Sequence, residues 1–366
     1  MRSSTAVLVT LFTLLTTFGT ASAGAGAGAY TTSAGQNAPT APVARSVRDD
    51  DGVVRTRIVQ ERVAADSFGN AQGNDHDLAI DGAFEGQTVA VIQLYTVGFD
   101  FSLPKEALKQ KGFSVYRWVD TVPTPAELER GLEKSSQLWI IADSTRHLSD
   151  EHVRVIKKFF DAGHGVYIWG DNQPYYADAN VVASALLDGA SMEGDLIGDQ
   201  VVGVRTDSGK PGVLPNHLLT TGLEHLYEGI TIATIKPGRS KLQPLLHGSA
   251  GNLVAAYYDQ DGRRAILDGG FTRLYNKWDT AGTARYVKNA AAWLVNAERF
   301  GDAVVAPSVR SAAVIAAPAP ITPAPTVQTA PTPSPSLATN AIGLVLVLLM
   351  TSFLLVLYVP GLSRRD

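Results

Sequence analysis

The apolar and polar positions between residues 84 and 300 predict strands and helices that alternate along the chain. Four short apolar runs, rich in Val, Ile and aromatic residues, are typical of buried strands. They lie at residues 88–93, 114–119, 138–142 and 166–169. Segments with helical spacing follow them, at residues 104–111, after Thr124, between Ser149 and Gly163, and at 179–187. This alternation is typical of βαβ units around a parallel sheet.

Two of the predicted helices carry start signals in the sequence. Thr124 and Glu127 have the spacing of a capping box, and Pro125 occupies the first helical position. Ser149 is a typical N-cap followed by two acidic residues, and Gly163 is a typical helix end. These signals place both helices between strands of the sheet.

The second half of the domain has a different pattern, with strands that follow one another directly. Strands are predicted at residues 200–204, 230–235, 253–258 and 264–267, and a helix at 283–297. The last two strands flank residues 259–262, a hairpin turn of sequence DQDG. The fold class that we predict is α/β, a doubly wound and mainly parallel sheet with an antiparallel extension, in one domain over residues 84–300.

Apolar segments at the two ends predict export and membrane anchoring. Residues 1–23 have the charge, apolar stretch and Ala-Ser-Ala site of a signal peptide. Residues 339–360 are predicted to be a transmembrane helix, because their apolar stretch of about 28 Å approaches the thickness of a bilayer core. Arg364 and Arg365 then place residues 361–366 in the cytoplasm. We therefore expect a single-pass protein of the cell membrane, with its domain outside the cytoplasm, in a prokaryotic envelope.

Two further segments connect these parts. Residues 24–83 are predicted to be a leader of low order with one possible strand at 53–63, and residues 301–338 a stalk rich in Pro and Ala. A stalk, an apolar segment and terminal arginines also describe a sorting signal that a transpeptidase cleaves. No LPxTG sequence precedes the segment, so we prefer a retained anchor.

Composition excludes several classes of function. The net charge is −4 and the basic residues are scattered, whereas nucleic-acid binding needs a concentrated basic face. The chain has no cysteine, which excludes thiol catalysis and Cys-ligated metals. The seven histidines show no metal-binding spacing and the glycines form no phosphate-binding loop. We expect no cofactor, no protein-bound metal and no nucleic-acid partner.

Polar residues cluster after three predicted strands, where the carboxyl ends of a parallel sheet bind ligands. Each of them has an alternative role as a turn former or helix cap. The set predicts a shared ligand-binding crevice formed by Asp143, Arg146, Asp171, Asn172, Tyr175, Tyr176, Asp178, Asp268, Thr272 and Arg273. Aspartates of this set are candidates for an all-oxygen Ca²⁺ or Mg²⁺ site as well, but their spacing matches no known loop. Stacking on a sugar and packing in the core are alternative roles for Tyr175, Tyr176, Tyr275 and Trp278.

The segment VYIWGDNQPYYADANVVASALL, a strand, a tight Gly turn and a helix, resembles the nucleophile elbow of class I glutamine amidotransferase-like domains. The late segment RRAILDGGFTRLYNKWDTAGTARYVKNAAAWL resembles the end of such domains, including the trehalose-utilisation type and uncharacterised membrane-anchored proteins. The resemblance covers residues 84–300 and implies an amidotransferase-like, flavodoxin-like fold. That family's activity requires a Cys at the elbow and a His after the late strand. This chain has Asp171 or Asn172 and Asp268 at those places, so the resemblance implies no glutamine hydrolysis and no catalytic residue.

Three hypotheses for function remain. The first is an extracytoplasmic domain, silent as an amidotransferase, that binds a small molecule or an envelope protein. The second is a carboxylate- or metal-dependent enzyme of the same fold that acts on a carbohydrate or related small molecule, with Asp171 and Asp268 as its acid–base or metal-binding residues. It requires a carboxyl of raised pKa in a cleft. The third is a structural subunit of a membrane complex.

Overall fold

The computed structural model describes residues 40–48, 52–62, 64–72, 76–205, 210–278 and 280–309. The predicted signal peptide, the stalk from residue 310 onward, and the predicted transmembrane and cytoplasmic segments lie outside these residues. Within the described ranges, no helix is both long enough and apolar enough to cross a bilayer. Export and anchoring therefore stay predictions.

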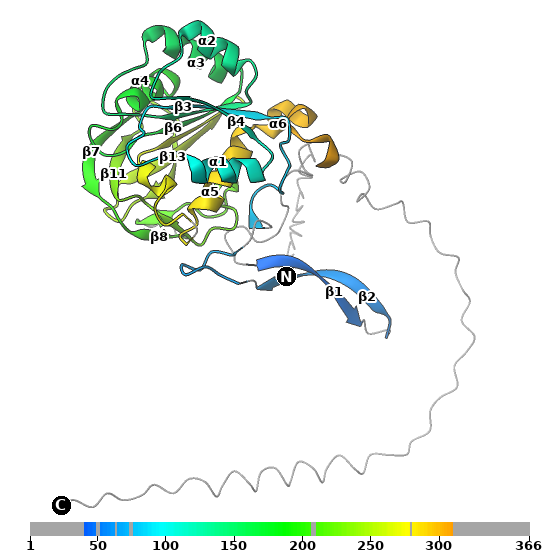
Figure 1. The fold of residues 1–366 in the computed structure, drawn as a ribbon. Helices are drawn as coiled ribbons and strands as arrows, with labels where there is room; N and C mark the ends of the chain where they lie inside the picture. The colour runs from blue at the N-terminus through cyan, green and yellow to red at the C-terminus, as the bar shows by residue number, and fades with distance from the viewer. Residues whose placement is uncertain are drawn as a thin grey trace, which may run out of the picture. The chain divides into compact units, whose positions relative to one another are not determined.

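The centre of the described domain is an eight-stranded sheet (Figure 1). Its strands run in the order β4-β3-β5-β6-β14-β13-β12-β9. The first five pair in parallel and are β4 (Ser114–Val119), β3 (Thr88–Gln93), β5 (Gln137–Ile141), β6 (Gly165–Trp169) and β14 (Arg263–Asp268). The last three pair antiparallel and are β13 (Leu253–Gln260), β12 (Gln243–His247) and β9 (Gly212–Val213). The predicted α/β class and antiparallel extension are confirmed.

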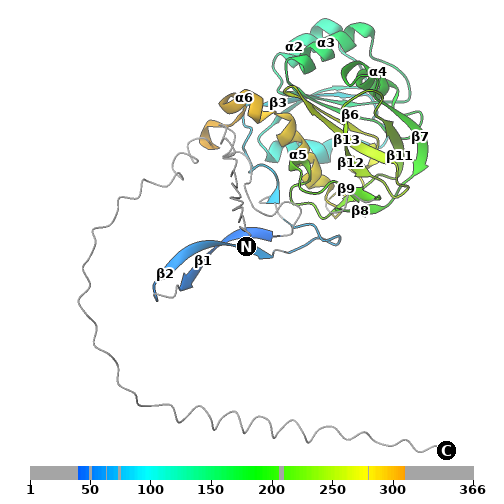
Figure 2. The ribbon, with the colours of Figure 1, turned by 180° about the vertical axis from the view of Figure 1, so that it is seen from behind.

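Helices cover both faces of this sheet, as Figures 1 and 2 show. On one face α1 (Ser102–Gln110) packs against α5 (Thr283–Leu294). On the other face α2 (Pro125–Leu132), α3 (Asp150–Asp161) and α4 (Ala177–Leu186) pack in a row. Residues of the central strands alternate between the two cores: Trp139 and Tyr167 face the α1 side, whereas Leu138 and Ile168 face the α3 side. Burial on both faces explains why these strands are continuous apolar runs.

The two predicted helix starts are confirmed. Thr124 and Glu127 form the capping box before α2, where the backbone N–H of Thr124 donates to Oε2 of Glu127 at 2.8 Å. Ser149 caps α3, and its reciprocal partner is His152, whose Nδ1 accepts from the Ser149 amide at 3.1 Å. His152 is therefore a capping residue, and it is buried.

The antiparallel half contains strands that the sequence pattern did not predict. The strand β7 (Ser191–Ile197) pairs with β11 (Thr231–Lys236) in a separate two-stranded ribbon. Another pair joins β8 (Val201–Gly203) and β10 (His225–Tyr227). Among the missed strands, β7 has the sequence SMEGDLI and β12 contains Pro244. Gly, Asp and Pro disfavour strands, so side-chain pattern alone does not reveal these two.

Some predicted bounds differ from the structure. The β13–β14 hairpin turns at Asp261 and Gly262 alone, because Gln260 pairs with Arg263. The last predicted helix, 283–297, divides into α5 and α6 (Ala297–Phe300), since Asn296 has a left-handed φ of 59°. Short 3-10 turns occur at η2 (Leu218–Thr220), η3 (Phe271–Leu274) and η4 (Gly301–Val304).

The residues on either side of the predicted domain have more structure than the pattern predicted. Where one strand was expected, β1 (Thr40–Arg48) and β2 (Val54–Arg62) form an antiparallel hairpin. Leu78 and Ala79, in the predicted leader, are core residues, and so are Val304 and Val305, in the predicted stalk. The packed domain thus extends beyond residues 84–300 at both ends.

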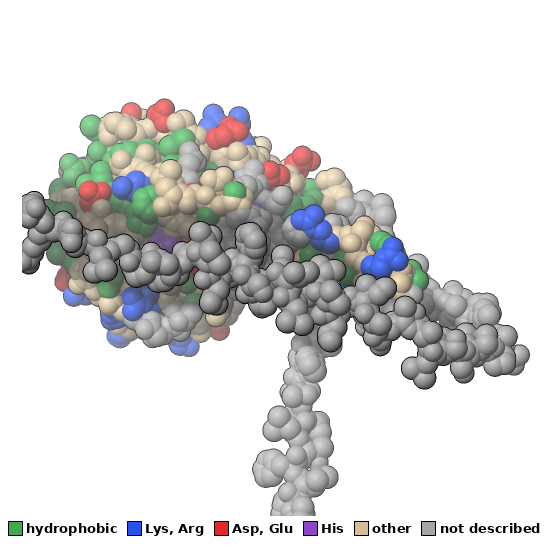
Figure 3. All heavy atoms as spheres, turned by 90° about the horizontal axis from the view of Figure 1, so that it is seen from below, with side chains coloured by type: hydrophobic (Ala, Val, Ile, Leu, Met, Phe, Trp, Pro, Cys, Tyr) green, Lys and Arg blue, Asp and Glu red, His purple; other side chains and the backbone are tan. Residues whose placement is uncertain are grey.

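Figure 3 shows one face of the molecule, on which Lys and Arg side chains lie among Asp and Glu side chains.

Candidate functional site

The carboxyl ends of β3, β5, β6 and β14 meet at one edge of the sheet, where a cavity of about 240 Å³ lies. This is the edge at which open α/β sheets bind ligands. The cavity is lined by Tyr95, Ala142, Asp171, Asn172, Tyr175, Ile230, Thr231, Phe271, Thr272 and Tyr275. Its lining therefore combines four aromatic rings with four polar side chains, those of Asp171, Asn172, Thr231 and Thr272.

The β7–β11 ribbon forms one wall of this cavity. The side-chain amide of Asn180, on α4, makes two hydrogen bonds to the backbone of Met192 in β7. Its Nδ2 donates to the Met192 carbonyl at 2.9 Å, and its Oδ1 accepts from the Met192 amide at 2.6 Å. On β11, the amide of Ala233 donates to the carbonyl of Gly269 at 2.9 Å. Both contacts hold the ribbon against the sheet, so that Thr231 faces the cavity.

The turn after β6 places Asp171 in the cavity. Gly170 begins it, and a Cβ at this position would lie 2.5 Å from Sδ of Met192. The Asp171 amide then donates to the Tyr175 carbonyl at 3.0 Å, which closes the turn. The amide of Asn172 donates to Oδ1 of Asp171 at 3.0 Å. The side chain of Asp171 is held in place by its own turn.

Asp171 is a buried carboxyl, 5% exposed. Burial raises its pKa from 3.8 to about 7, although the Asn172 amide, the Arg273 charge and the Thr231 hydroxyl oppose this rise. None of the ion pairs among the described residues includes Asp171. The cavity thus holds a carboxyl whose charge is not neutralised by a paired side chain.

The aromatic rings of the cavity contact one another at steep angles. Tyr95 lies edge-on to Tyr175 and to Phe271, with ring centroids 5.5 and 5.3 Å apart. Tyr275 meets Phe271 at 5.8 Å. Burial raises the pKa of Tyr275 to about 12, with smaller contributions from Tyr95 and Asp171. Both Tyr95 and Tyr275 therefore keep their phenolic protons at neutral pH.

Asp268, predicted to lie in the crevice, is fully buried and does not line the cavity. Its carboxylate accepts four hydrogen bonds, from Arg273 Nη1 at 2.8 Å, Gly270 N at 3.0 Å, Tyr286 Oη at 3.1 Å and Tyr167 Oη at 3.3 Å. Burial raises the pKa of Asp268, and Arg273 is the main opposing influence. Asp268 and Arg273 form a buried ion pair that does not itself line the cavity.

The other predicted residues have separate roles. Asp178 is buried and accepts from the amides of His147 and Leu148 at 2.9 and 2.7 Å, so it braces the loop after β5. Arg146 is exposed and pairs with Asp150. Neither lines the cavity, so both predictions as binding residues receive no support from the geometry.

Two other predicted residues, Asp143 and Tyr176, do not line the cavity. Asp143 is half-buried, with Oδ2 3.6 Å from Nε2 of His147, and its charge contributes to a raised pKa of Tyr95. Tyr176 packs against the core on the α3 side. Of the ten predicted residues, the cavity lining contains Asp171, Asn172, Tyr175 and Thr272.

The sequence prediction missed several lining residues. Tyr95 follows β3 by two residues, and the strand-end rule would have found it had it been applied to this strand. Phe271 lies in the loop after β14, next to predicted residues. Tyr275, in the same loop, is a stacking candidate only and is not part of the predicted set. Thr231 begins β11, and no local signal in the sequence places that ribbon at the sheet's edge.

The candidate metal ligands do not come together. In the described part of the chain, no three His, Asp or Glu residues are grouped as a metal site would require.

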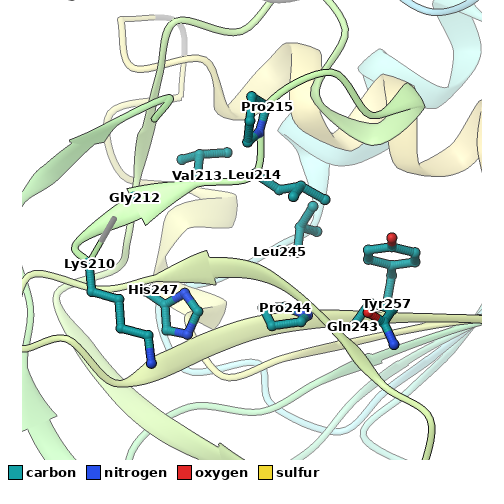
Figure 4. Close-up of a pocket in the computed structure, with 10 residues that line it drawn as sticks. All are labelled: Lys210, Gly212, Val213, Leu214, Pro215, Gln243, Pro244, Leu245, His247 and Tyr257. Carbon is teal, nitrogen blue, oxygen red and sulfur yellow. The ribbon is translucent and has the colours of Figure 1, made fainter. Parts of the chain in front are cut away.

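A second cavity, of about 350 Å³, lies at the antiparallel edge of the sheet between β9 and β12 (Figure 4). Lys210 and His247 lie at one end of it, and Gln243 and Tyr257 at the other, with Leu214 and Leu245 between them. Its polar groups do not converge on one point, whereas those of ligand sites do. The cavity at the parallel edge is the better candidate.

Comparisons with known proteins find similarity in structure alone. No family model matches the chain, and no curated protein matches it.

Three solved structures are similar over part of the chain. An exo-β-1,4-mannosidase, Op5Man5 from Opitutaceae bacterium strain TAV5, has a TM-score of 0.33 at 12% identity, covering 57% of this chain and 36% of its own. A GMP synthase-like protein from Thermoplasma acidophilum has a TM-score of 0.39 at 9% identity, with coverage of 59% and 97%. A ThuA-like protein from Parabacteroides merdae has a TM-score of 0.40 at 11% sequence identity, and the match covers 58% of this chain and 90% of that protein. The last two have the glutamine amidotransferase-like fold.

Proposed function

We propose that residues 76–309 form a small-molecule-binding domain of amidotransferase-like fold, without amidotransferase activity. The observation that carries this proposal is Asp171, a buried carboxyl without an ion-pair partner among the described residues, in an aromatic cavity at the ligand-binding edge of the sheet. Burial of an unpaired carboxyl costs stability. Proteins retain such groups where a ligand or a reaction uses them.

The chemistry of glutamine hydrolysis does not fit this site. The turn after β6 presents Asp171 in place of a nucleophile, and the whole chain lacks cysteine. None of the described residues that line the cavity is a histidine. An activated nucleophile needs such a base within hydrogen-bond reach.

The proposal includes the location of the domain. The predicted signal peptide and the predicted segment 339–360 would hold it outside the cytoplasmic membrane. Fractionation of cells that express the full chain, followed by protease treatment of intact spheroplasts, tests this part. Membrane-bound protein whose domain is digested from outside would support the proposal, and protection of the domain would contradict it.

The binding role is tested by a thermal-shift screen of the full-length protein in detergent against amines, sugars, amino acids and nucleotides. A ligand should raise the melting temperature of the wild type and leave that of Asp171→Asn unchanged. Asp302→Asn, an exposed aspartate outside the cavity, is the matched control and should respond like the wild type. A screen in which Asp171→Asn responds like the wild type to every ligand would contradict the proposed site.

An enzymatic role is the second candidate, and the raised pKa of Asp171 favours it. A carboxyl that titrates at about 7 is suited to donate and accept protons near neutral pH. Asp268 is not available as its catalytic partner, because Asp268 is buried against Arg273. Turnover of a sugar or related substrate, lost in Asp171→Asn with binding retained, would establish this alternative.

A further inference from the structure

We infer that the cavity takes a small organic cation, an ammonium group that pairs with Asp171 and lies among the aromatic rings. This inference specifies the ligand class of the site proposed above and rests on that proposed function.

The charges around the cavity favour a cation. Asp171 lines the cavity and Asp143 lies close enough to influence Tyr95. The charge that opposes the Asp171 carboxyl comes from Arg273, which is held elsewhere: its Nη1 donates to Asp268 and its Nη2 donates to the carbonyl of Glu228, each at 2.8 Å. A positively charged ligand would supply the partner that Asp171 lacks among the described side chains.

The arrangement of the rings also favours a cation. Tyr95 meets Tyr175 at an interplanar angle of 87° and Phe271 at 73°, and Phe271 meets Tyr275 at 61°. Each of these pairs is in edge-to-face contact, and all four rings line the cavity. An aromatic ring attracts a cation that lies over its negatively polarised face.

Size and polarity narrow the ligand further. The cavity volume of about 240 Å³ is below the range of about 300–1,000 Å³ that is typical of drug-sized ligands. Anions are disfavoured by Asp171. Among the polar groups of the lining, Oγ1 of Thr272 already accepts a hydrogen bond from the Ile230 amide at 2.7 Å. A compact ammonium head group fits these conditions best.

The experiment compares cations with neutral molecules of the same shape. The full-length protein in detergent is titrated calorimetrically at pH 8 and constant ionic strength. The probes are choline and propylammonium chloride, and their neutral counterparts are 3,3-dimethylbutan-1-ol and propan-1-ol. We expect at least one cation to bind at least tenfold more tightly than its neutral counterpart. Equal affinity for cation and counterpart, or no binding of either cation at millimolar concentration, would overturn the inference.

Variants identify the site. Asp171→Asn and Tyr175→Leu should each weaken cation binding at least fivefold. Tyr116→Leu, a tyrosine 52% exposed on β4 and outside the cavity, should have no effect. Cation binding that Asp171→Asn leaves unchanged would place the ligand elsewhere and overturn the inference.

A parallel titration with neutral sugars separates the inference from the proposed function. If the wild type binds a sugar and neither cation, and Asp171→Asn does not bind the sugar, the inference that the ligand is a cation is wrong. The proposed binding site at Asp171 is then still supported. If no cation, sugar, amino acid or nucleotide binds in a way that depends on Asp171, both the inference and the proposed binding function fail.

Discussion

Asp171 lies two residues after β6, and Asp268 is the last residue of β14, the neighbouring parallel strand. Both are buried. Asp268 has an arginine, two tyrosine hydroxyls and a backbone amide around its carboxylate. Asp171 has one backbone amide from its own turn, a nearby threonine hydroxyl and no ion pair among the described residues. The same residue type at the same edge of one sheet is thus built into the core in one case and presented to a cavity in the other.

The different partners of the two carboxyl groups distinguish a structural role for Asp268 from a ligand-binding role for Asp171. A buried charge is strongly destabilising unless it is paired and hydrogen-bonded. Asp268 meets both conditions, so removing its partners should destabilise the fold. Asp171 does not meet them, so removing its charge should stabilise the fold and impair ligand binding. The following changes test this contrast, beginning with the largest expected effect.

Arg273→Ala should destabilise the protein most. It leaves Asp268 buried without its counter-charge, and breaking a buried pair in this way costs about 3–5 kcal/mol. The free energy of unfolding is measured by urea denaturation. Arg146→Ala, which removes an exposed pair with Asp150, should cost less than about 1 kcal/mol. Equal losses in the two variants would refute the structural role of Asp268.

Asp171→Asn should change how stability depends on pH. The pKa of Asp171 in the folded protein, about 7, lies above the 3.8 of an ordinary aspartate, so the folded state holds the proton more firmly than the unfolded state. Its contribution to stability is complete below about pH 4 and is lost as the pH rises to about 7. At about 1.4 kcal/mol per pKa unit, the loss amounts to up to about 4 kcal/mol.

The measurement is the difference in unfolding free energy between wild type and Asp171→Asn at pH 4.5 and pH 8. The groups that surround Asp171 are Asp268 at the end of β14, Arg273 in η3, Tyr95 two residues after β3, Tyr275 and Thr231. They are present in both proteins, so the comparison isolates the change at residue 171. The variant should be the more stable protein at pH 8, and a less stable variant there would contradict the contrast between the two aspartates.

Gly270→Ala tests how closely Arg273 is packed. A Cβ at residue 270 would overlap Nη2 of Arg273 and the carbonyl of Glu228. Such crowding typically costs about 1–3 kcal/mol. Gly203→Ala on β8 is the control, because its Cβ would meet His225 at an ordinary 3.6 Å. A loss confined to Gly270→Ala in thermal unfolding is expected, and equal stability of the two variants would speak against the tight pairing.

Hydroxyl removals include the smallest expected effect. Tyr286→Phe deletes the 3.1 Å hydrogen bond to Asp268 and should cost about 1.5–3 kcal/mol, the value for a bond to a charged group. Tyr175→Phe keeps the ring that lines the cavity and should change unfolding free energy by less than about 0.5 kcal/mol. A greater loss in Tyr175→Phe than in Tyr286→Phe would reverse the predicted contrast.

Much of the sheet could be predicted because burial on both faces leaves a strong local signal. The runs that form β3, β5 and β6 are continuously apolar, and the capping box at Thr124 marks the start of its own helix. The strands β7 and β12 are short or polar, and tertiary pairing holds them in place. The strand that contains Thr231 was predicted, but without β7 the sequence indicates no pairing that would place it at the edge of the sheet.

The sequence could not distinguish Asp171 from Asp268. Both lie beside glycine at the end of an apolar strand. Arg273 and the Gly270 amide lie within five residues of Asp268. The two tyrosine partners are remote in sequence: Tyr167 lies 101 residues before Asp268 and Tyr286 lies 18 residues after it. Three-dimensional partners, and not the local pattern, determine which aspartate is available to a ligand.

The most direct test is an NMR titration of the full-length protein with ¹³C-labelled aspartate carboxyl groups, in which Asp171→Asn assigns the signal of Asp171. We predict a pKa of about 7 for Asp171, which falls when a saturating organic cation is added. A pKa near the ordinary value of 3.8 would show that Asp171 is solvated or paired, and would contradict the central claim.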